Sequence, residues 1–309
     1  MGKKTVCAVV VTYNRKNLLL NCLNALKAQS YPLEHIIVVD NASQDGTVDF
    51  LSEHGWVSGV SEKFSLISLA NNQGGAGGFY AGIEFAYQRG FDYIWLMDDD
   101  GYPSNDSLAQ LIPYCSDDCY IGPIVLDSQT KNKLSFSLRL PASIDVIDFY
   151  SKIPQSYREE NIIKDIVLPF NGTLISSKLV QKMGLPHREY FIWGDEREYT
   201  IRAKKHQANI LTVVSAIFYH PADSSSSTPM FFNKLRFNNA NSNLKLYCFC
   251  RNSIALFSEH YGIHYSLAFW LKTTWFFSFT QPDLAKLKFT WRAMWHGLRK
   301  DFSHHKEYL

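Results

Sequence analysis

The chain alternates apolar runs rich in β-branched residues with segments whose apolar residues recur at helical spacing. The run at 6–11 is followed by apolar residues at helical spacing between 18 and 26, and a second run occupies 36–39. Two more runs, at 65–69 and 93–97, flank another segment expected to contain a helix. Runs that are apolar throughout are typical of parallel strands buried on both faces. The pattern therefore predicts an α/β, Rossmann-like fold with a mostly parallel sheet, in which ligands bind at the carboxyl ends of the strands.

The pattern is weaker in the rest of the chain. Further strands are expected at 120–126, 133–140, 170–175 and 210–219, and further helices near 177–183 and 198–205. A polar stretch at 155–161 is predicted to be a mobile loop, and the run Ser224–Ser227 between two prolines is the best candidate for a linker. We therefore predict one domain at 1–223 and a helical, basic and aromatic segment at 224–309.

The composition narrows the class of protein. A hydrophobic fraction of 46% in 309 residues can fill a sizeable core, and 31 basic against 29 acidic residues argue against a nucleic-acid binder. Six cysteines without a CxxC pair suit reduced, cytosolic thiols. The N-terminus lacks the features of a signal peptide, and the longest apolar stretch, 265–279, is shorter than the ~20 residues of a spanning helix. A cytosolic protein is expected, with contact to a membrane surface left open.

Three consecutive aspartates, Asp98, Asp99 and Asp100, directly follow the apolar run at 93–97. Such crowding of negative charge is unfavourable unless a cation neutralises it, and carboxylate oxygens suit Mg²⁺ or Mn²⁺. A divalent metal that holds a diphosphate is therefore the favoured interpretation. An acidic surface turn is the alternative.

Polar residues also follow the first two predicted strands. Thr12, Tyr13 and Arg15 come after the first, and Asp40 and Asn41 close the second. Each group alone is ordinary for a turn or a helix cap. Because the carboxyl ends of parallel strands share one edge of a sheet, a common ligand crevice is favoured over independent turns.

A glycine-rich segment, Asn71–Phe79, precedes a helix expected from about residue 81. We interpret it as a loop whose glycines, among them Gly74 and Gly75, let the backbone approach a phosphate or sugar next to Asn72. The segment has neither the GxGxxG spacing nor a Walker lysine. A nicotinamide-dependent enzyme and a P-loop NTPase are therefore both disfavoured.

The acids Asp195, Glu196 and Glu198 gather near the start of a predicted helix, just after Trp193. The helix dipole favours carboxylates at this position, so simple capping is the alternative to a catalytic role. His220 follows the last predicted strand and has the chemistry of a metal ligand, although a lone histidine is more often structural.

Together these segments resemble family 2 glycosyltransferases and, among them, bacterial UDP-galactofuranosyltransferases. The matching motifs are VVVTYNR, VVDNAS, NNQGGAGGF, WLMDDD, FNGTLISS, YFIWGDEREYTIRA and FYHP, in the order of that family. The match spans about 5–221, and the segment Tyr247–Asn252 resembles an aromatic-Arg-Asn element of the family. The resemblance implies a GT-A fold with a C-terminal helical appendage.

The resemblance also implies roles for individual residues. Asp98 and Asp100 would hold Mn²⁺ or Mg²⁺ together with His220. The family's catalytic base is an aspartate, and Glu196 stands at its position, so the base is Glu196 or its neighbour Asp195. The nucleotide-sugar site is expected to comprise Thr12, Tyr13, Arg15, Asp40, Asn41, Asn72, Gly74, Gly75, Asp98, Asp99 and Trp193.

The predicted function is inverting, metal-dependent transfer of galactofuranose from UDP-galactofuranose to a glycan or lipid-linked glycan, such as O-antigen or capsule. A rhamnosyltransferase that uses dTDP-rhamnose is the close alternative. A non-catalytic nucleotide-sugar-binding protein is the alternative from another class, and a missing carboxylate would favour it. The glycine- and lysine-rich signature of a nucleotidyltransferase is absent from the N-terminal region.

The C-terminal tail is basic, with six Lys or Arg against two acids over 286–309. Thr280 is a candidate N-cap for a helix that follows it. Seven apolar residues then recur at helical spacing and are expected to share one face: Leu284, Leu287, Trp291, Met294, Trp295, Leu298 and Phe302. This face is expected either to pack on the catalytic domain or to bind the cytoplasmic surface of the inner membrane.

Overall fold

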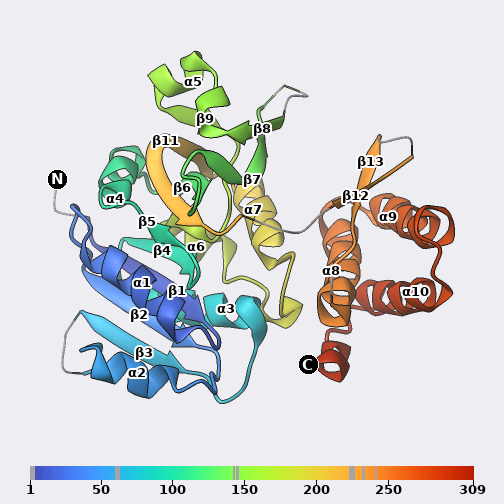
Figure 1. Ribbon diagram of the computed structural model, residues 1–309, viewed down its shortest axis with the longest axis horizontal. Coiled ribbons are helices and arrows are strands. Elements are labelled where there is room, and N and C mark those ends of the chain that lie inside the picture. The colour runs from blue at the N-terminus through green and yellow to red at the C-terminus, as the bar shows by residue number, and fades with distance from the viewer. Residues whose placement is uncertain are drawn as a thin grey trace. The chain divides into compact units, whose positions relative to one another are not determined.

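The computed structural model describes residues 4–59, 63–141, 143, 146–222, 227–231, 234–240 and 242–309 (Figure 1). The chain divides into two compact units. Unit 1 contains 1–186 and 202–223, and unit 2 contains 187–201 and 224–309. The predicted linker Ser224–Ser227 lies outside the described residues except for Ser227.

The first half of unit 1 is a parallel sheet, as the sequence predicts. Its strands stand in the order β3-β2-β1-β4. They are β1 (Val6–Thr12), β2 (His35–Asp40), β3 (Phe64–Ser68) and β4 (Tyr93–Asp98), and the helices between them are α1 (Lys16–Lys27), α2 (Thr47–Glu53) and α3 (Gly74–Gln88). Successive residues of β1 point to opposite faces of the sheet. Val10 packs in the core that includes Leu23 of α1, whereas Val9 and Val11 face α3. Both faces of the sheet are therefore covered, which explains the uninterrupted apolar runs.

The second half of unit 1 extends the sheet with strands of mixed direction. β10 (Asn171–Ser176) lies antiparallel between β4 and β6 (Cys119–Asp127), and β11 (Asn209–His220) runs parallel to β6. The remaining strands are β5 (Tyr102–Pro103), β7 (Lys133–Arg139), β8 (Val146–Phe149) and β9 (Ile162–Lys164). The other helical elements are α4 (Ser107–Leu111), η1 (Ile112–Tyr114), η2 (Tyr150–Lys152), α5 (Gln155–Glu160) and α6 (Ser177–Met183).

The prediction of a mobile loop at 155–161 is wrong. Residues 155–160 form α5, which ends at Asn161 in the left-handed region with φ of 58°. Asparagine tolerates this conformation and commonly ends helices in this way. The short length of α5 and its lack of fully buried side chains explain why the sequence shows no apolar periodicity there.

The glycine-rich segment is also not a loop. The helix α3 already begins at Gly74, and Gly74 alone among the segment's glycines has a positive φ, of 69°. A Cβ atom on Gly78 would stand 2.4 Å from Val11 Cγ1, and one on Gly82 would stand 2.3 Å from Val9 Cγ1. The glycines therefore let α3 lie directly on the sheet, a packing role that the motif alone does not distinguish from a phosphate-binding loop.

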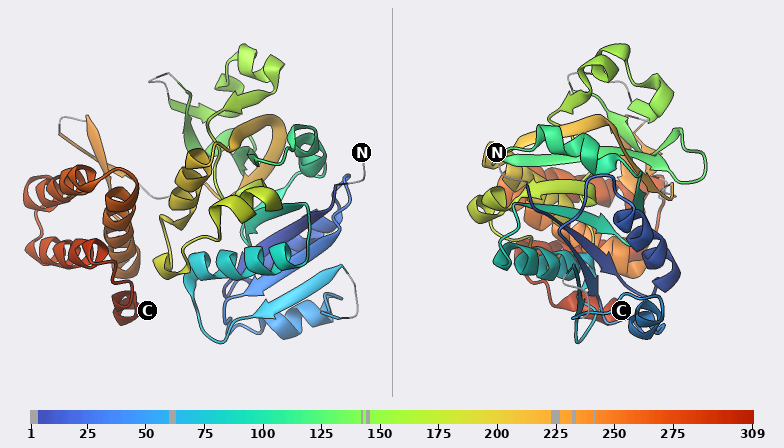
Figure 2. Two further views of the ribbon diagram at one scale, coloured as in Figure 1. Left: turned by 180° about the vertical axis from the view of Figure 1, so that it is seen from behind. Right: turned by 90° about the vertical axis from the view of Figure 1, so that its left-hand side faces the viewer.

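Unit 2 consists mainly of helices (Figure 2). It contains η3 (Arg188–Tyr190), the first part of α7 (Asp195–Lys205), a hairpin of β12 (Ser227–Met230) and β13 (Leu235–Asn238), α8 (Asn243–His260), α9 (Ile263–Trp275), η4 (Phe276–Thr280), α10 (Leu284–Leu298) and η5 (His304–Tyr308). Its core gathers Phe237, Tyr247, Phe276, Phe277 and Met294. In the described part of the chain, no helix combines the length and apolar character needed to cross a membrane.

Candidate active site

The carboxyl ends of β1 and β4 meet where the strand order of the sheet reverses. β1 pairs with β2 on one side and with β4 on the other, and Val11 lies opposite Asp98. This register places Thr12 and the residues after it beside the three aspartates. An open α/β sheet binds its ligands at such a switch point, so the predicted common crevice has a structural basis.

Asp99 links the two strand ends. Its Oδ2 accepts a hydrogen bond from Thr12 Oγ1 at 2.7 Å and from the Tyr13 amide at 3.4 Å. Arg15 Nη1 lies 3.2 Å from Asp99 Oδ1 and 2.6 Å from Asp100 Oδ2. The Arg15 side chain is half exposed, whereas that of Asp99 is buried, so Arg15 pairs with the buried carboxyl group from the solvent-exposed side. We call Thr12, Arg15, Asp98–Asp100 and His220 the carboxylate cluster.

The three carboxyl groups differ in how readily they ionise. Burial, reinforced by the charges of Asp100 and Asp99, raises the pKa of Asp98 to about 8. Burial raises the pKa of Asp99 to about 6, against the opposing bonds from Thr12 and Arg15. Burial also disfavours ionisation of Asp100, but the contacts with His220 and Arg15 outweigh it and lower its pKa. Three carboxyl groups thus share one arginine and one histidine, and burial keeps Asp98 mostly protonated at neutral pH while no cation is bound.

His220, the last residue of β11, turns its ring toward Asp100. Its Nδ1 lies 2.6 Å from the Pro221 carbonyl and must donate to it, which leaves Nε2, 3.2 Å from Asp100 Oδ1, as the ligating nitrogen of the neutral ring. Metal-binding histidines are commonly oriented by such a bond from the other nitrogen. Burial lowers the pKa of His220, but the contact with Asp100 raises it more.

The donor set of the cluster fits a divalent metal ion. Asp100 Oδ1 is buried and accepts no well-aligned hydrogen bond, and it faces an imidazole nitrogen. Carboxylate oxygen and imidazole nitrogen together suit Mn²⁺. Asp100 and His220 are thus brought together as predicted, whereas Asp98 is not part of a set of three ligand atoms within 4.8 Å of one another among the described residues.

The one such set in the described part of the chain lies in unit 2 and consists of His187, Glu198 and Glu259. Glu198 is fully buried and lies 3.0 Å from His260 Nε2, and Glu259 pairs with Lys300 at 2.9 Å. His187 Nδ1 also lies 3.1 Å from Glu189. Lys300 and the two histidines thus join these acids in a polar network between the first part of α7 and the end of α8. Sequence reasoning missed its histidines because neither belongs to a motif.

The end of β2 is joined to the start of α3 by two asparagines. Asn41 Nδ2 donates to Asn72 Oδ1 and to the Gly74 carbonyl, each at 3.0 Å, and Asn41 Oδ1 accepts from the Gln73 amide at 2.8 Å. Asp40 is buried and accepts from the Ser43 amide at 3.1 Å. The structure therefore brings Asp40, Asn41 and Asn72 together at the predicted edge. Gly75 follows Gly74 in α3, and a Cβ atom added to it would point into open space.

Trp193, Asp195 and Glu196 belong to unit 2, where an unusual backbone run leads into α7. Phe191, Trp193 and Gly194 all have positive φ, of 66°, 62° and 99°. Glu196 accepts a hydrogen bond from the Gly194 amide at 3.1 Å, so it caps the helix, and Asp195 is buried. Glu196 therefore has the capping contact that was one of the two interpretations from the sequence. This contact is compatible with the other interpretation, a catalytic role.

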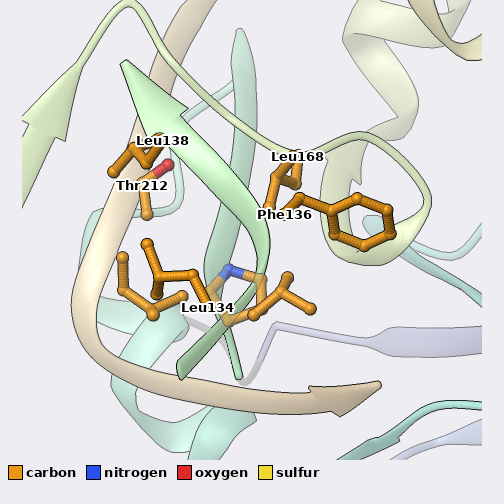
Figure 3. Close-up of a pocket in the computed structure, with 8 residues that line it drawn as sticks. Leu134, Phe136, Leu138, Leu168 and Thr212 are labelled. Atoms are coloured by element: carbon orange, nitrogen blue, oxygen red, sulfur yellow. The ribbon is translucent and has the colours of Figure 1, made fainter. Parts of the chain in front are cut away.

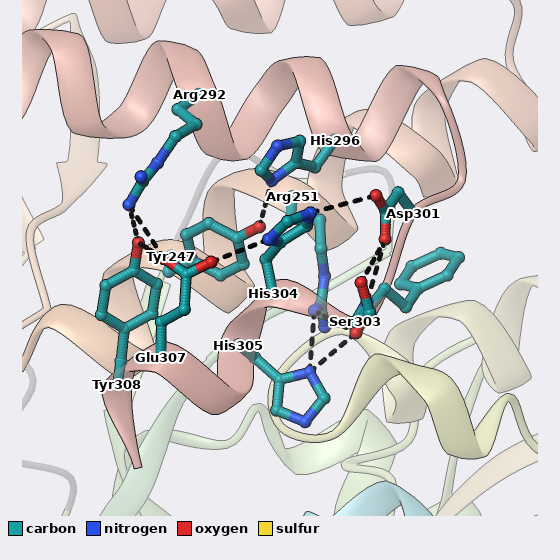
Figure 4. A network of polar contacts seen from close by, with 11 residues as sticks. Tyr247, Arg251, Arg292, His296, Asp301, Ser303, His304, His305, Glu307 and Tyr308 are labelled. Carbon is teal, nitrogen blue, oxygen red and sulfur yellow. Dashed lines mark hydrogen bonds and ion pairs between the residues drawn. The ribbon is translucent and has the colours of Figure 1, made fainter.

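Two buried side chains of α8 hold this run in place. Asn252 Nδ2 lies within 3.0 Å of the carbonyl oxygens of Tyr190, Ile192 and Trp193, and Arg251 Nη2 donates to the Tyr190 carbonyl at 2.7 Å. We call Arg251 and Asn252 the carbonyl clamp. Figure 4 shows Arg251 beside Tyr247 and His305, in a network formed by the C-terminal residues.

The carbonyl clamp explains the aromatic-Arg-Asn element of the sequence. Burial lowers the pKa of Arg251, which is fully enclosed. The signal that could have revealed it is an arginine within the mostly apolar run 246–257, because a charged residue is buried only with dedicated partners.

An apolar pocket of unit 1 does not match a sugar nucleotide (Figure 3). Its lining consists of Pro123, Ile124, Val125, Leu134, Phe136, Leu138, Leu168 and Thr212. Ligand sites orient polar ligands with a few well-placed polar groups, and this lining offers the Thr212 hydroxyl as its polar side chain. The strand ends are therefore the better candidate for the donor.

Several known proteins are similar to this chain in sequence. The model of glycosyl transferase family 2 matches residues 7–172. Galactofuranosyltransferase GlfT1 of Mycolicibacterium smegmatis is 29% identical over 303 residues, which cover 97% of this chain and 98% of that protein. The dTDP-rhamnosyl transferase RfbF of Shigella flexneri is 26% identical over 200 residues, 64% of this chain and 62% of that one.

Solved structures with low sequence identity share the architecture. GalNAc-T7 with UDP, GalNAc and Mn²⁺ superposes with a TM-score of 0.60 at 12% identity, over 98% of this chain and 58% of that one. Residues 1–349 of S. aureus TarS in complex with UDP superpose with a TM-score of 0.55 at 14% identity, over 98% and 89%. Since the family model covers more than half of the chain, the protein belongs to glycosyl transferase family 2 and is a glycosyltransferase with the GT-A fold.

Proposed function

We propose that this glycosyltransferase moves galactofuranose from UDP-galactofuranose to a cell-surface glycan such as O-antigen or capsule. The observation that carries the proposal is the likeness to GlfT1, a galactofuranosyltransferase, over nearly the full length of both chains. We place the reaction in the cytoplasm, where the six free cysteines would stay reduced.

Asp98, Asp100 and His220 would hold Mn²⁺ or Mg²⁺. When bound, the ion would neutralise the cluster and stabilise negative charge on the departing diphosphate. Arg15 would assist from the solvent side, because it is half exposed and already carries its charge next to Asp100. Thr12 and Asp99 would keep Arg15 in position through the bonds that link β1 to β4.

The uridine part of the donor would lie against the neighbouring strand ends. Asp40 and Asn41 would supply hydrogen-bonding groups, with Tyr13 and Asn72 next to them. Gly74 and Gly75 stand at the N-terminus of α3, where amide groups and the helix dipole favour an anion. Trp193 would contact the sugar.

Glu196 would act as the base that takes the proton from the acceptor hydroxyl. The hydroxyl oxygen would then attack the anomeric carbon as the bond to UDP breaks, which gives direct displacement with inversion and needs no covalent intermediate. Asp195 is the alternative base. Glu196 is only partly buried, as an acid that meets an incoming hydroxyl should be, whereas Asp195 is buried.

Transfer of rhamnose from dTDP-rhamnose is the second candidate function, supported by the partial likeness to RfbF. That likeness covers about two thirds of each chain, so it is the weaker support. A non-catalytic nucleotide-sugar-binding protein is disfavoured because it would be expected to lack one of the carboxylates at the proposed positions. All four are present: Asp98, Asp100, Asp195 and Glu196.

A donor panel tests the proposal. Purified protein with Mn²⁺ and a glycan acceptor extract is given UDP-galactofuranose, UDP-galactopyranose, UDP-glucose or dTDP-rhamnose, and nucleotide release is measured. We expect UDP release from UDP-galactofuranose alone. Turnover of dTDP-rhamnose alone would contradict the donor assignment, and tight donor binding without any release would favour the binding protein.

A further inference from the structure

Unit 2 exposes large apolar side chains on two neighbouring helices. Leu271 on α9, Phe279 at the end of η4 and Leu284 at the start of α10 are 71%, 67% and 75% exposed. Scattered exposed apolar residues are ordinary on a protein surface, but a gathered patch marks an interaction site. The question is therefore whether these residues form one surface.

From α9 into η4, a series of exposed apolar residues recurs every four positions. Leu267, Leu271 and Trp275 of α9 and Phe279 of η4 form this series, and Trp275 and Phe279 have ring centroids 4.6 Å apart. The opposite side of the helix is already used, because Phe269 and Phe276 lie in the core of unit 2. The exposed series is thus a second apolar face that the fold leaves uncovered.

The seven apolar residues predicted to share one face of α10 differ in burial, and Phe302 lies beyond this helix, which ends at Leu298, so that prediction holds only in part. Met294 is buried against the rest of unit 2 with Ala293 and Gly297, whereas Trp291 and Trp295 are exposed. The helix also begins differently, since Asp283 caps it by accepting from the Lys286 amide at 2.9 Å, and Thr280 ends η4 instead.

The exposed faces of the two helices adjoin. Trp291 Nε1 donates to Thr274 Oγ1 of α9 at 2.8 Å, which joins them side by side. We call Leu271, Trp275, Phe279, Leu284, Trp291 and Trp295 the aromatic face.

The charged residues around the aromatic face are mostly basic. From 263 to 299 the chain carries five Lys or Arg residues and a single acid, Asp283, which is engaged as the helix cap. Lys288 and Arg299 are exposed on α10 and just after it, next to the tryptophans, and the Arg299 guanidinium lies 5.0 Å from the Trp295 ring centroid. A partner with an apolar interior and an anionic surface would complement this face.

We propose that the aromatic face binds the surface of an anionic lipid bilayer. Leucine and phenylalanine would enter the boundary of the acyl chains, tryptophans would lie at the level of the headgroups, and lysine and arginine would face anionic lipids. α9 has 13 residues and α10 has 15, so they suit lying along a membrane surface. The inference does not depend on the identity of the donor sugar.

Co-sedimentation of the full chain with vesicles tests the proposal. We expect binding to vesicles of phosphatidylglycerol and phosphatidylcholine, and weaker binding to phosphatidylcholine alone. The variant Leu271→Ser/Phe279→Ser/Leu284→Ser should lower the partition coefficient at least roughly tenfold, because it removes most of the inserted apolar surface. Lys288→Gln/Arg299→Gln should reduce binding to the anionic vesicles and leave binding to the neutral ones unchanged.

The matched control is Leu18→Ser/Val48→Ser/Val146→Ser, which removes three exposed apolar side chains from unit 1. It should sediment like the unaltered chain. Equal sedimentation of both triple variants, or no sedimentation of the unaltered chain with either vesicle, would overturn the proposal. Light scattering after size exclusion checks a rival occupant: a dimer that the aromatic-face variant abolishes, without vesicle binding, would assign the face to a second copy.

Discussion

The carboxylate cluster of unit 1 and the carbonyl clamp of unit 2 each set an arginine beside oxygen atoms, but those oxygens differ in charge. Arg15 is half exposed and faces the carboxylates of Asp99 and Asp100. Arg251 is fully buried and donates to backbone carbonyls. The first arrangement buries a carboxyl group, Asp98, that can ionise at neutral pH only when a cation joins it. The second completes the hydrogen bonds of a backbone run that secondary structure does not satisfy.

The difference separates binding from positioning. A buried carboxyl group such as Asp98, whose pKa rises to about 8, is unfavourable in the folded chain until a cation or a proton joins it. Neutral carbonyls held by Asn252 need no further partner. We therefore expect changes in the carboxylate cluster to abolish activity with little loss of stability, and changes in the carbonyl clamp to lower stability while the nucleotide still binds to unit 1.

The largest expected effect follows removal of a proposed metal ligand. Asp98→Asn and Asp100→Asn should each lower turnover at least roughly a thousandfold, because the charge on the leaving diphosphate loses its stabilisation. Metal-free Asp98→Asn should melt no lower than the metal-free parent at neutral pH, because Asp98, with a pKa of about 8, must take up a proton on folding, and asparagine of the same size avoids that cost. Asp117→Asn, an exposed aspartate paired with Lys178, is the control and should have normal activity. Full activity in excess chelator would remove the metal from the proposal.

The next effect concerns the two acids at the start of α7. Glu196→Gln keeps size and hydrogen bonding but removes basicity, so kcat should fall by roughly 100-fold or more with donor binding intact. Asp195→Asn should mainly raise the acceptor KM. Steady-state kinetics on both variants, with exposed Glu160→Gln as control, measures the difference. If Glu196→Gln keeps a near-normal kcat while Asp195→Asn is inactive, the two roles are exchanged.

The carbonyl clamp should show the opposite balance. Asn252→Leu removes the side-chain donor of the Ile192 and Trp193 carbonyls and leaves the Tyr190 carbonyl to Arg251, so the free energy of unfolding should fall by about 2–3 kcal/mol. Affinity for the UDP part of the donor should stay near normal, because the proposed nucleotide ligands of unit 1 are unchanged. Urea unfolding and donor titration measure the two quantities, with exposed Asn132→Leu as control. A variant that is stable but fails to bind donor would break the distinction between the two regions.

The sequence predicted the parts of the fold whose signal is local. The apolar runs indicated β1 to β4 because each strand is buried on both faces, and the polar residues after β1, β2 and β4 do meet at one edge. The carbonyl clamp could not be predicted in the same way, since Asn252 lies about 60 residues from the carbonyls that it contacts. No local pattern reports such a distant pairing.

The sequence-based predictions also failed where one pattern fits two structural roles. The glycines after Asn72 fit both a phosphate-binding loop and a close-packed helix, and the distance from Gly78 to the side chain of Val11 distinguishes them. On α10 the apolar spacing predicted an amphipathic helix but not its division into a buried and an exposed face. That division depends on where α8 lies, which the sequence of α10 does not contain.

The smallest effect concerns the packing of α3 behind the carboxylate cluster. Gly78→Ala would place a Cβ atom 2.4 Å from Val11 Cγ1, so the helix must shift and the free energy of unfolding should fall by about 1–2 kcal/mol. Gly75→Ala is the matched control in the same helix, because its added Cβ would meet open space and alanine favours a helix over glycine by about 0.5–1 kcal/mol. It should therefore be neutral or stabilising. The double variant Gly78→Ala/Val11→Ala should recover part of the loss, since the smaller partner makes room for the new methyl group, and a double-mutant cycle in urea isolates that coupling. If Gly78→Ala is as stable as the parent and instead weakens donor binding, the glycines serve the ligand, and the interpretation of this segment as a packing helix is wrong.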